Sequence, residues 1–538
     1  MTSIQSPQSM LAPGTPVLQP SLLAEATSKG KADAIVFFNQ VEKPGLASAM
    51  STLEAAESMP LGAPRKEAVY TALTALGTAT IDAHKPLLDK LQQSGQISGV
   101  DNLITFNAVR VRNASVEALR SLAKDGAWQV IADSKVAVPM IPASAEDSVH
   151  GASMIPLGKA QAGAVPGDPV EDPKAIYMDW GVKKMQAPAA WQQGITGAGI
   201  VVASLDTGVI TDHSGLKTNY RGTRADGTQD HNYNLLNVVE KNSQYPIDDV
   251  GHGTHTLGNV VGNDAHHLTG VAPDAKFIVA RGLGEAGGNL FALMGAMEWM
   301  LAPTDLAGKN PRPDLAPDIV TNSWGGPPVS QTFLWQALRN WRRAGIIPVF
   351  AAGNNRKAVP GEVAVPGMYK EAITVGATEP DDSRAFFSMY GPSEFSRDKK
   401  PEVAAPGTWS YSTYPDGTFR DTFIIDGKRY PASGTSMATP HVAGAVALYM
   451  QAHPNATYDQ VLGALKAAGT LAGKPNEEIG YGRVQVEKLI APGSIAKDAK
   501  LTDAGRVKQL MEQVAQSTVF SSRPTGQVAP ESAVAASA

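Results

Sequence analysis

The sequence predicts an α/β protein in which a parallel sheet is covered by helices on both faces and is preceded by a small α+β domain. From about residue 176 to 489, continuous apolar runs alternate with helical segments. Strands that are apolar throughout are typical of parallel sheets that are buried on both faces. A shorter alternation of strands and helices occupies residues 33–139, and a Pro- and Gly-punctuated stretch separates the two regions.

The apolar runs of the larger region define its expected strands, which cover residues 200–205, 277–280, 319–320, 346–352 and 372–375. Helices are expected between several of them, at residues 290–301 and 333–343, and a further apolar helix at 442–450. In such folds, side chains that act on a ligand gather at the carboxyl ends of the strands.

The smaller region has the pattern of a ferredoxin-like domain. Its expected elements are a strand at 34–38, a helix at 66–91 with a break near Gly77, a strand at 103–111, a helix at 116–123 and a strand at 128–136. It contains no cluster of reactive side chains.

The chain is therefore divided into five segments. They are a disordered arm (1–32), the small domain (33–139), a linker open to proteolysis (140–174), the main domain (175–492) and a mostly disordered tail (493–538). An amphipathic patch at 507–514 in the tail is a candidate short helix.

Composition excludes several classes of protein. The 538 residues carry a net charge of −5 and no basic cluster, which argues against a nucleic-acid partner. The absence of cysteine excludes disulfides, thiolate catalysis and Cys-ligated zinc. No apolar run reaches the length of a membrane span. The first basic residue is Lys29, and prolines interrupt the apolar residues before it, so we expect no Sec signal peptide.

The main domain contains a serine whose surroundings in the sequence suit a nucleophile. Residues 434–444, GTSMATPHVAG, place Ser436 among small residues before the apolar helical run. A serine hydroxyl becomes nucleophilic when a base removes its proton and nearby dipoles stabilise the oxyanion. The N-terminus of a helix offers such dipoles.

Three polar residues upstream of Ser436 are candidate partners. Asp206 and Asn354 each follow an apolar run, although either could be an ordinary turn residue when considered alone. His252 lies in GHGTHTLG, where His255 raises a metal-binding alternative that lacks the spacing and the glutamate of HExxH. The order Asp, His, Ser also disfavours the nucleophile elbow of a lipase-like esterase, which requires G-x-S-x-G and has Ala438 in its last position here.

The segments around these four residues resemble the signature segments of the subtilase family of serine endopeptidases. Similarity extends over about residues 175–490, through WGVKKMQAPAAWQQGITGAGI, GVAPDAK, NSWGG, KPEVAAPG and GYGRVQVEKL, and is greatest to the bacillopeptidase-F-like branch. The resemblance implies a subtilisin-like fold and a monomeric enzyme that hydrolyses proteins or peptides. It implies no cofactor for the chemistry itself.

The resemblance assigns a role to each of the four residues. Ser436 would be the nucleophile, and His252 the general base and then the acid. Asp206 would orient His252, and Asn354 would donate to the oxyanion together with the Ser436 backbone N–H.

The resemblance also assigns substrate-binding positions, which are Ser323, Trp324, Gly325, Asn355 and Ala364. The first three match an edge segment that pairs with the substrate backbone. The last two match the pocket for the side chain before the scissile bond. Since neither Asn355 nor Ala364 is acidic, we expect a neutral or apolar preference.

The small domain resembles the inhibitor-type propeptide of subtilases, especially over LITFNAVRVRNASVEALRSLAKDGAWQVIADSKV. This resemblance implies that it assists folding, blocks the cleft and is removed by self-cleavage within 140–174. The alternative is an unrelated ferredoxin-like partner domain.

A strong calcium site of many subtilases is expected to be degraded in this chain. The position nine residues after Asp206 is Gly215, and the loop NDAHHLT is short. We therefore assign no metal ligands, while calcium elsewhere stays an open alternative.

Two further questions stay open at this stage. A propeptide and the family habit favour export by a non-classical route over a cytoplasmic location. A subtilase-fold protein without catalysis, acting as a binding module, is the alternative from another functional class. Such relatives usually lose a catalytic residue, and this chain keeps all four.

Overall fold

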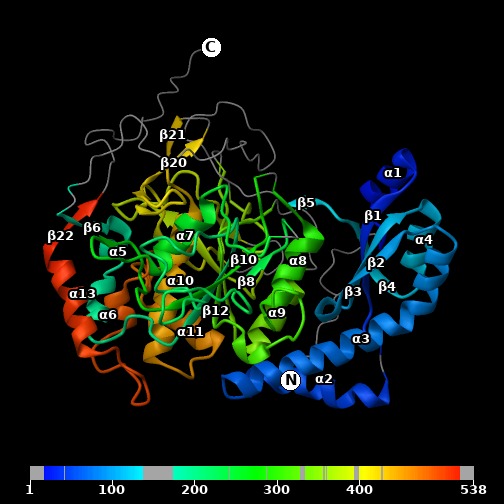
Figure 1. The fold of residues 1–538 in the computed structure, drawn as a ribbon, viewed down its shortest axis with the longest axis horizontal. Helices are drawn as coiled ribbons and strands as arrows, with labels where there is room; N and C mark the ends of the chain where they lie inside the picture. Colours follow the sequence, from blue (N-terminus) through cyan, green and yellow to red (C-terminus); the bar gives the residue numbers. More distant parts are fainter. Residues whose placement is uncertain are drawn as a thin grey trace, which may run out of the picture.

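The structure, a computed structural model, describes residues 17–520 except for short gaps at 42, 137–171, 173, 241–242, 286, 327–333, 356–357, 359, 393–398 and 426–427. Nearly all of the predicted linker, with its maturation site, lies outside the described residues, as do 1–16 and 521–538. The described residues form a small N-terminal unit and a larger C-terminal unit that lie side by side (Figure 1).

The larger unit is built on a seven-stranded sheet with the order β17-β14-β13-β12-β7-β10-β8. Every neighbouring pair is parallel. The strands are β7 (Val201–Asp206), β8 (Leu235–Asn237), β10 (Lys276–Arg281), β12 (Ile319–Asn322), β13 (Ile347–Ala351), β14 (Ile373–Thr378) and β17 (Val403–Pro406). All five predicted strands are present, and the parallel sheet is confirmed. Only β8 and β17, each four residues or shorter, were not predicted.

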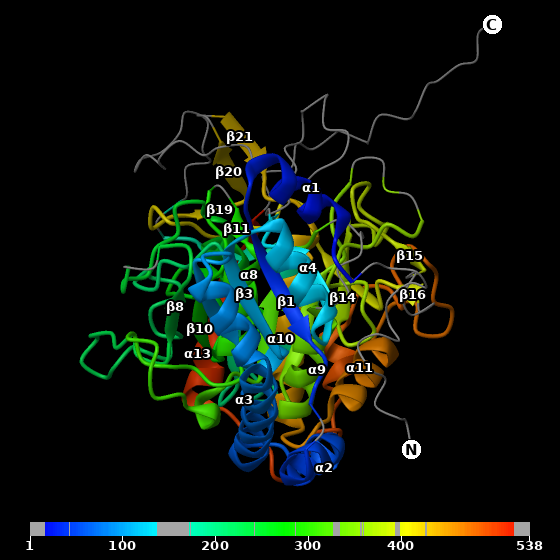
Figure 2. The same ribbon diagram turned by 90° about the vertical axis from the view of Figure 1, so that its right-hand side faces the viewer.

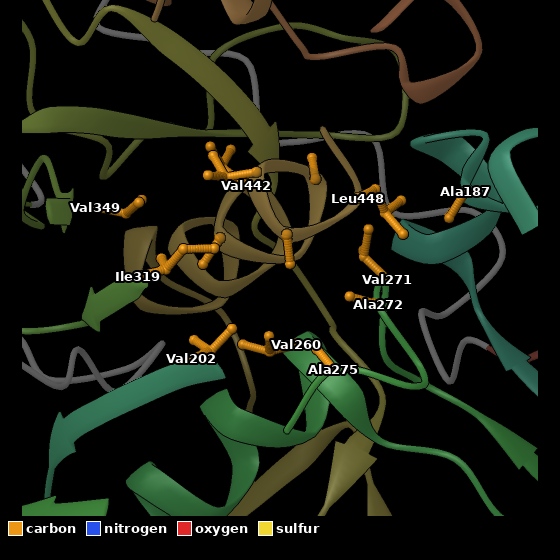
Figure 3. Packing of buried hydrophobic residues seen from close by; sticks show 14 of the residues in the cluster. Ala187, Val202, Val260, Val271, Ala272, Ala275, Ile319, Val349, Val442 and Leu448 are labelled. Carbon is orange, nitrogen blue, oxygen red and sulfur yellow. The ribbon is translucent and has the colours of Figure 1, made fainter. Parts of the chain in front are cut away.

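Alternate residues of each strand face opposite layers of helices. On β7, Val202 packs in the cluster that contains α7 (His252–Val261) and α10 (Thr435–Ala452). Its neighbour Ala203 packs in the cluster that contains α8 (Leu290–Trp299) and α9 (Leu334–Ala344). Figure 3 shows Val442 and Leu448 of α10 among Val202, Val260 and Ile319 of the first cluster. Helices therefore cover both faces of the sheet, as predicted.

Helix α10 begins seven residues earlier than the apolar run predicted, so Ser436 is its second residue. Pro440 obscures this start in the sequence, because proline cannot donate the helical hydrogen bond to the carbonyl four residues before it. That carbonyl belongs to Ser436, and it accepts a hydrogen bond from the Ser323 hydroxyl instead, at 2.8 Å. A tertiary hydrogen bond thus replaces the missing helical one at the place where the proline suggests that the helix is interrupted.

The small unit is a four-stranded antiparallel sheet with the order β2-β3-β1-β4. Its elements are β1 (Ala32–Phe38), α2 (Ala47–Ala55), α3 (Ala63–Gln93), β2 (Gly99–Leu103), β3 (Ala108–Ala114), α4 (Val116–Lys124), β4 (Ala127–Ala132) and β5 (Lys135–Val136). The predicted strand at 103–111 is instead the junction of β2 and β3, where Asn107 adopts a left-handed conformation. The predicted break at Gly77 is wrong, since α3 runs through it.

One apolar cluster joins the two units. It contains Phe37 and Trp128 of the small sheet together with Met297 of α8 and Trp341 of α9. Figure 2 shows the small sheet in front of these two helices. The small unit therefore covers one helical layer of the larger unit.

Both regions that flank the predicted domains contain ordered elements, in contrast to the disorder expected at 1–32 and 493–538. Helix α1 (Pro20–Lys29) buries Leu22 and Ala26 against the small sheet. Helix α13 (Ala504–Gln516) buries Leu510 in the core of the larger unit, and Arg506 bonds Asp274 at 2.9 Å. These contacts come from distant partners, which local composition does not reveal.

Strand β22 (Ser517–Phe520) follows α13 and pairs in parallel with β6 (Ile176–Asp179), which also pairs with β9 (His267–Leu268). Shorter helices complete the larger unit: α5 (Trp180–Lys184), α6 (Ala187–Trp191), α11 (Tyr458–Ala467) and α12 (Val486–Leu489). Its short strand pairs are β11 (Gly288–Asn289) with β5, β15 (Gly391–Pro392) with β16 (Lys399–Lys400), β18 (Ser412–Thr413) with β19 (Phe419–Arg420), and β20 (Thr422–Ile425) with β21 (Lys428–Pro431). Across the described part of the chain, every helix is too short or too polar to cross a membrane.

Candidate active site

Three of the predicted site residues lie at the carboxyl edge of the parallel sheet. Asp206 is the last residue of β7, Ser323 follows β12, and Asn354 follows β13 by three residues. Because β7, β12 and β13 are adjacent in the sheet, their ends bring these residues to one edge.

His252 is the first residue of α7 and lies against Asp206. Its Nδ1 is 2.7 Å from Asp206 Oδ1, and the two side chains are only 1% and 2% exposed. The other ring nitrogen, Nε2, has no hydrogen-bond partner. The helix enters through Gly251 at φ 83°, a backbone conformation that favours glycine. His252 is therefore held at one nitrogen and available at the other.

The N-terminal ends of α7 and α10 meet. Val250, two residues before His252, and Met437, next to Ser436, belong to one small apolar cluster with Phe423. Ser436 is tied to Ser323 by two bonds: its hydroxyl donates to the Ser323 carbonyl at 3.0 Å, and the Ser323 hydroxyl donates to the Ser436 carbonyl. This packing brings the serine and the histidine to the same end of the molecule.

Asn354 is oriented by Thr435, the residue before the serine. Its Oδ1 accepts from the Thr435 backbone N–H at 2.9 Å and from the Thr435 hydroxyl at 3.0 Å. Its Nδ2 lies over Gly434, where a β-carbon would be 3.4 Å away. The amide oxygen is thus fixed on Thr435, which aims the amide N–H group along the segment that carries Ser436.

Sequence reasoning missed Asp248, which stabilises the start of the helix that carries His252. Its carboxylate accepts hydrogen bonds from the backbone of Gly251, the backbone and hydroxyl of Thr254, and the hydroxyl of Thr207. Burial raises the pKa of Asp248, and these donors oppose the rise. The available signal was the position of Asp248 four residues before His252. A carboxylate there can accept hydrogen bonds from the unpaired backbone N–H groups at the start of α7.

The net electrostatic effect on His252 favours the protonated ring. Burial lowers the pKa of His252, but the charge of Asp206, its hydrogen bond and the charge of Asp248 together raise the pKa above its ordinary value. The ring can therefore accept a proton readily, as a general base must.

His255 does not join His252 in a metal site. Its Nε2 lies 3.1 Å from the carbonyls of both Ser410 and Arg420, and burial lowers the pKa of His255 to about 3. Its ring and that of His252 both pack on Phe423 of β20, with ring centroids 5.0 and 6.2 Å away. Within the described residues, no group of three or more His, Cys, Asp or Glu side chains could hold a metal ion.

The position of the family calcium site, which was expected to be degraded, does not fit a cation. A β-carbon at Gly215 would lie 2.7 Å from the Phe419 ring, so this ring fills the space of a carboxylate there. In the loop, Asp264 is already bonded to Ser214, to the His266 backbone and to His267.

The predicted substrate-binding residues divide into two groups. The Trp324 side chain is buried and packs edge-on against Phe350 at 5.4 Å, so only the backbone of this edge segment could contact a substrate. Asn355 follows Asn354 directly, and its amide donates to Glu362, a residue that sequence reasoning did not consider. Ala364 is buried beneath the segment that carries both asparagines.

Serine hydrolase sites combine a buried carboxylate, an imidazole with an available nitrogen and a serine. The three side chains described here have this chemistry and the chain order Asp, His, Ser. The model of the subtilase family matches residues 197–482. Bacillopeptidase F of Bacillus subtilis (strain 168) is 32% identical over 482 residues, covering 86% of this chain and 32% of that protein. Subtilisin Savinase of Lederbergia lenta is 35% identical over 309 residues, covering 56% of this chain and 95% of that protein. An alkaline protease of Alkalihalobacillus alcalophilus is 32% identical over 370 residues, covering 65% of this chain and 83% of that protein.

The chain belongs to the subtilase family, as its motifs predicted, and has the fold of a subtilisin-like serine endopeptidase. It spans about a third of the length of bacillopeptidase F and nearly the whole of Subtilisin Savinase.

Proposed function

We propose that this chain is a self-processing zymogen whose larger unit hydrolyses peptide bonds through an acyl-enzyme on Ser436. The observation that carries the proposal is His252, bonded through Nδ1 to Asp206 and unpartnered at Nε2, at the end of the molecule where α10 presents Ser436. A base in this state can take the proton of a hydroxyl.

In the first step, the Ser436 hydroxyl leaves the Ser323 carbonyl and gives its proton to His252 Nε2. Its oxygen attacks the substrate carbonyl carbon, and Asp206 stabilises the imidazolium that forms. The oxyanion is held by the N–H groups at the start of α10 and by Asn354, whose removal should lower turnover about 10²–10³-fold. His252 then protonates the leaving amine, and water releases the acyl group by the reverse sequence.

The small unit supplies a strand next to the sheet edge that carries the site. Its last described residues, β5, pair antiparallel with β11, which immediately precedes α8. The N-terminus of α8 is also covered, because Ser134 O accepts from Leu290 N at 2.9 Å and Asp133 Oδ1 accepts from Phe291 N at 2.9 Å. Strand addition of this kind is how an extended peptide occupies a substrate edge. It supports an inhibitory role for this unit.

Polar contacts also join the small unit to the larger one just before β12 and at the C-terminal end of α8. Lys66 Nζ lies 2.9 Å from Asp318 Oδ1 and donates to the Ala316 carbonyl at 2.8 Å. The backbone and hydroxyl of Thr105 donate to Glu298 of α8 at 2.7 and 2.9 Å. Burial raises the pKa of Glu298 although the Thr105 bonds oppose it. These groups need the small unit as a partner, which supports its role in folding the larger one.

The zymogen proposal is tested by Ser436→Ala in the full chain. The purified variant should stay a single chain, because no acyl-enzyme can form and residues 140–174 are therefore not cleaved. A matched variant of an exposed serine, Ser494→Ala, should be cleaved within 140–174 as the wild type is. If pure Ser436→Ala still separates in this segment, self-cleavage is wrong.

For the compartment we propose export, because a chain that carries its own inhibitor can be kept inactive until it has left the site of synthesis. N-terminal sequencing of the processed protein from separated cell and medium fractions tests this. Recovery of the processed form from the cell fraction alone would contradict it.

A further inference from the structure

The position of a substrate side chain follows from the two groups that bind the substrate carbonyl. A carbonyl between Asn354 and Ser436 places the side chain of its own residue beside the segments that carry them. One segment is 353–355, and the other is 323–326, which bonds Ser436 through Ser323. We expect these two segments to be the walls of the pocket for that side chain.

Ala364 closes the space between the two walls. A β-carbon at Gly325 or at Gly353 would lie only 2.8 Å from the Ala364 methyl group, so this methyl lies against both. The backbone of Gly326 exchanges two hydrogen bonds with Val365, at 2.8 and 3.1 Å. The segment that ends at Ala364 and Val365 is therefore the floor of the pocket.

Glu362 lies two residues before this floor and reaches the first wall. Its Oε2 accepts a hydrogen bond from Asn355 Nδ2 at 3.1 Å, and its side chain is partly exposed. A carboxylate can accept about four hydrogen bonds, so most of its capacity is unused. In the described part of the chain, no Lys, Arg or His lies within ion-pair distance of it.

We propose that Glu362 is the specificity-determining residue of this pocket and favours a lysine or arginine side chain before the scissile bond. The inference rests on the proposed peptidase function and reverses the neutral or apolar preference expected from Asn355 and Ala364 alone. Glu362 supplies the negative charge, and Asn355 holds the carboxylate at the wall. A long basic side chain buries its methylene groups between the walls and places its charged end at the carboxylate.

The test compares peptide p-nitroanilides that differ only in the residue before the scissile bond: Lys, Arg, Met, Gln and Glu. Glu362→Gln is the informative variant, because its amide oxygen can still accept from Asn355 while the charge is lost. The processed wild type should favour Lys over Met in kcat/KM, and Glu362→Gln should reduce that ratio about fivefold, the size of one partly exposed ion pair. The Met substrate should change by less than about twofold.

Two controls distinguish charge from other effects. Glu477→Gln removes an exposed carboxylate that belongs to neither wall segment nor the floor, and it should leave the Lys-to-Met ratio unchanged. Salt should lower the ratio in the wild type and not in Glu362→Gln, because salt screens a partly exposed pair.

The outcomes separate this inference from the proposed function. If the wild type cleaves the Met or Gln substrate but its Lys-to-Met ratio is the same in Glu362→Gln, the specificity role is overturned. If Glu362→Gln lowers kcat/KM equally for all five substrates, Glu362 only supports Asn355, and the inference fails as well. If the processed wild type cleaves none of them, the peptidase function itself fails.

Discussion

Among the described residues of the larger unit are two buried Asp–His pairs that differ in whether the second ring nitrogen has a hydrogen-bond partner. In the first pair, His252 bonds Asp206 through Nδ1 and leaves Nε2 without a partner. In the second pair, His441 Nε2 lies 3.1 Å from Asp179, and its Nδ1 lies 2.7 Å from the Met437 carbonyl one turn earlier in α10. All four side chains are buried. Composition and burial therefore do not separate them.

The difference teaches that an available nitrogen, and not the buried pair itself, marks His252 as the proposed catalytic histidine. The Asp179–His441 pair ties α10 to the N-terminal part of the larger unit. Asp179 also caps α5 and accepts from the Tyr411 backbone at 2.8 Å. With both nitrogens of His441 facing acceptors, none is left to take a proton from Ser436. This pair positions the helix that carries the nucleophile.

The largest expected contrast is in turnover. Asp206→Asn should lower kcat about 10⁴-fold, because the amide no longer holds His252 in the tautomer that exposes a basic Nε2. Asp179→Asn should change kcat by less than about tenfold, since it alters no group at the reacting atoms. Active-site-titrated enzyme and a peptide anilide provide the measurement. Equal losses in the two variants would break the comparison.

For stability, the order of the two variants should be reversed, with the larger effect in Asp179→Asn. Asp179→Asn should lower the free energy of unfolding by about 3 kcal/mol, because it removes one partner of a buried pair that joins separate elements. Asp206→Asn should lower the free energy of unfolding by only about 1 kcal/mol. The reason is that one ring nitrogen of His252, Nε2, has no hydrogen-bond partner either before or after the substitution. Urea unfolding of both in a Ser436→Ala background, which prevents self-digestion, checks this. A larger loss for Asp206→Asn would contradict it.

Another buried histidine, His255, should make stability depend on pH. The pKa of His255 is lowered to about 3, so between this value and its unfolded value the unfolded chain binds one more proton. Stability should therefore fall by about 1.4 kcal/mol for each unit as pH drops below about 6.5.

His255→Gln keeps a donor for the two carbonyls and should reduce this slope, whereas His266→Gln on an exposed loop should keep it. Unfolding free energies measured at several pH values decide the matter. An unchanged slope in His255→Gln would show that this ring does not stay neutral in the folded protein.

The smallest effect concerns the acid side of the pH–activity profile. Since the pKa of His252 is raised, kcat/KM should fall as pH decreases through a midpoint above 6.5. Asp248→Asn removes one of the charges that raise this pKa, so the midpoint should move to lower pH. The same profile for Asp179→Asn should stay in place. A midpoint below 6.5 in the wild type would refute the electrostatic account.

The sequence predicted those parts of the site that depend on chain order and strand ends. Asp206 and Asn354 became candidates because apolar runs stop just before them, and His252 and Ser436 because small residues surround each. The start of α10 was missed because Pro440 hides it, and only the Ser323 hydroxyl explains how the helix tolerates it.

Other features depend on contacts that no local pattern encodes. Glu362 was overlooked because its bond to Asn355 depends on the path of the loop between them. Helix α13 was expected to lie in a mostly disordered tail because its anchors, Asp274 and Asn263, are more than 230 residues away in the chain. The two Asp–His pairs could not be distinguished either, since the free nitrogen is visible only in three dimensions.

Labelling of the processed protein with a serine-directed fluorophosphonate tests the central claim most directly. Mass spectrometry should find the label on Ser436 in the wild type and in Asp179→Asn, and at a strongly reduced level in His252→Ala that an added protease has cleaved within 140–174. A processed wild type that takes up no label at Ser436 would favour a binding module without catalysis. Equal labelling in His252→Ala would show that His252 is not the base.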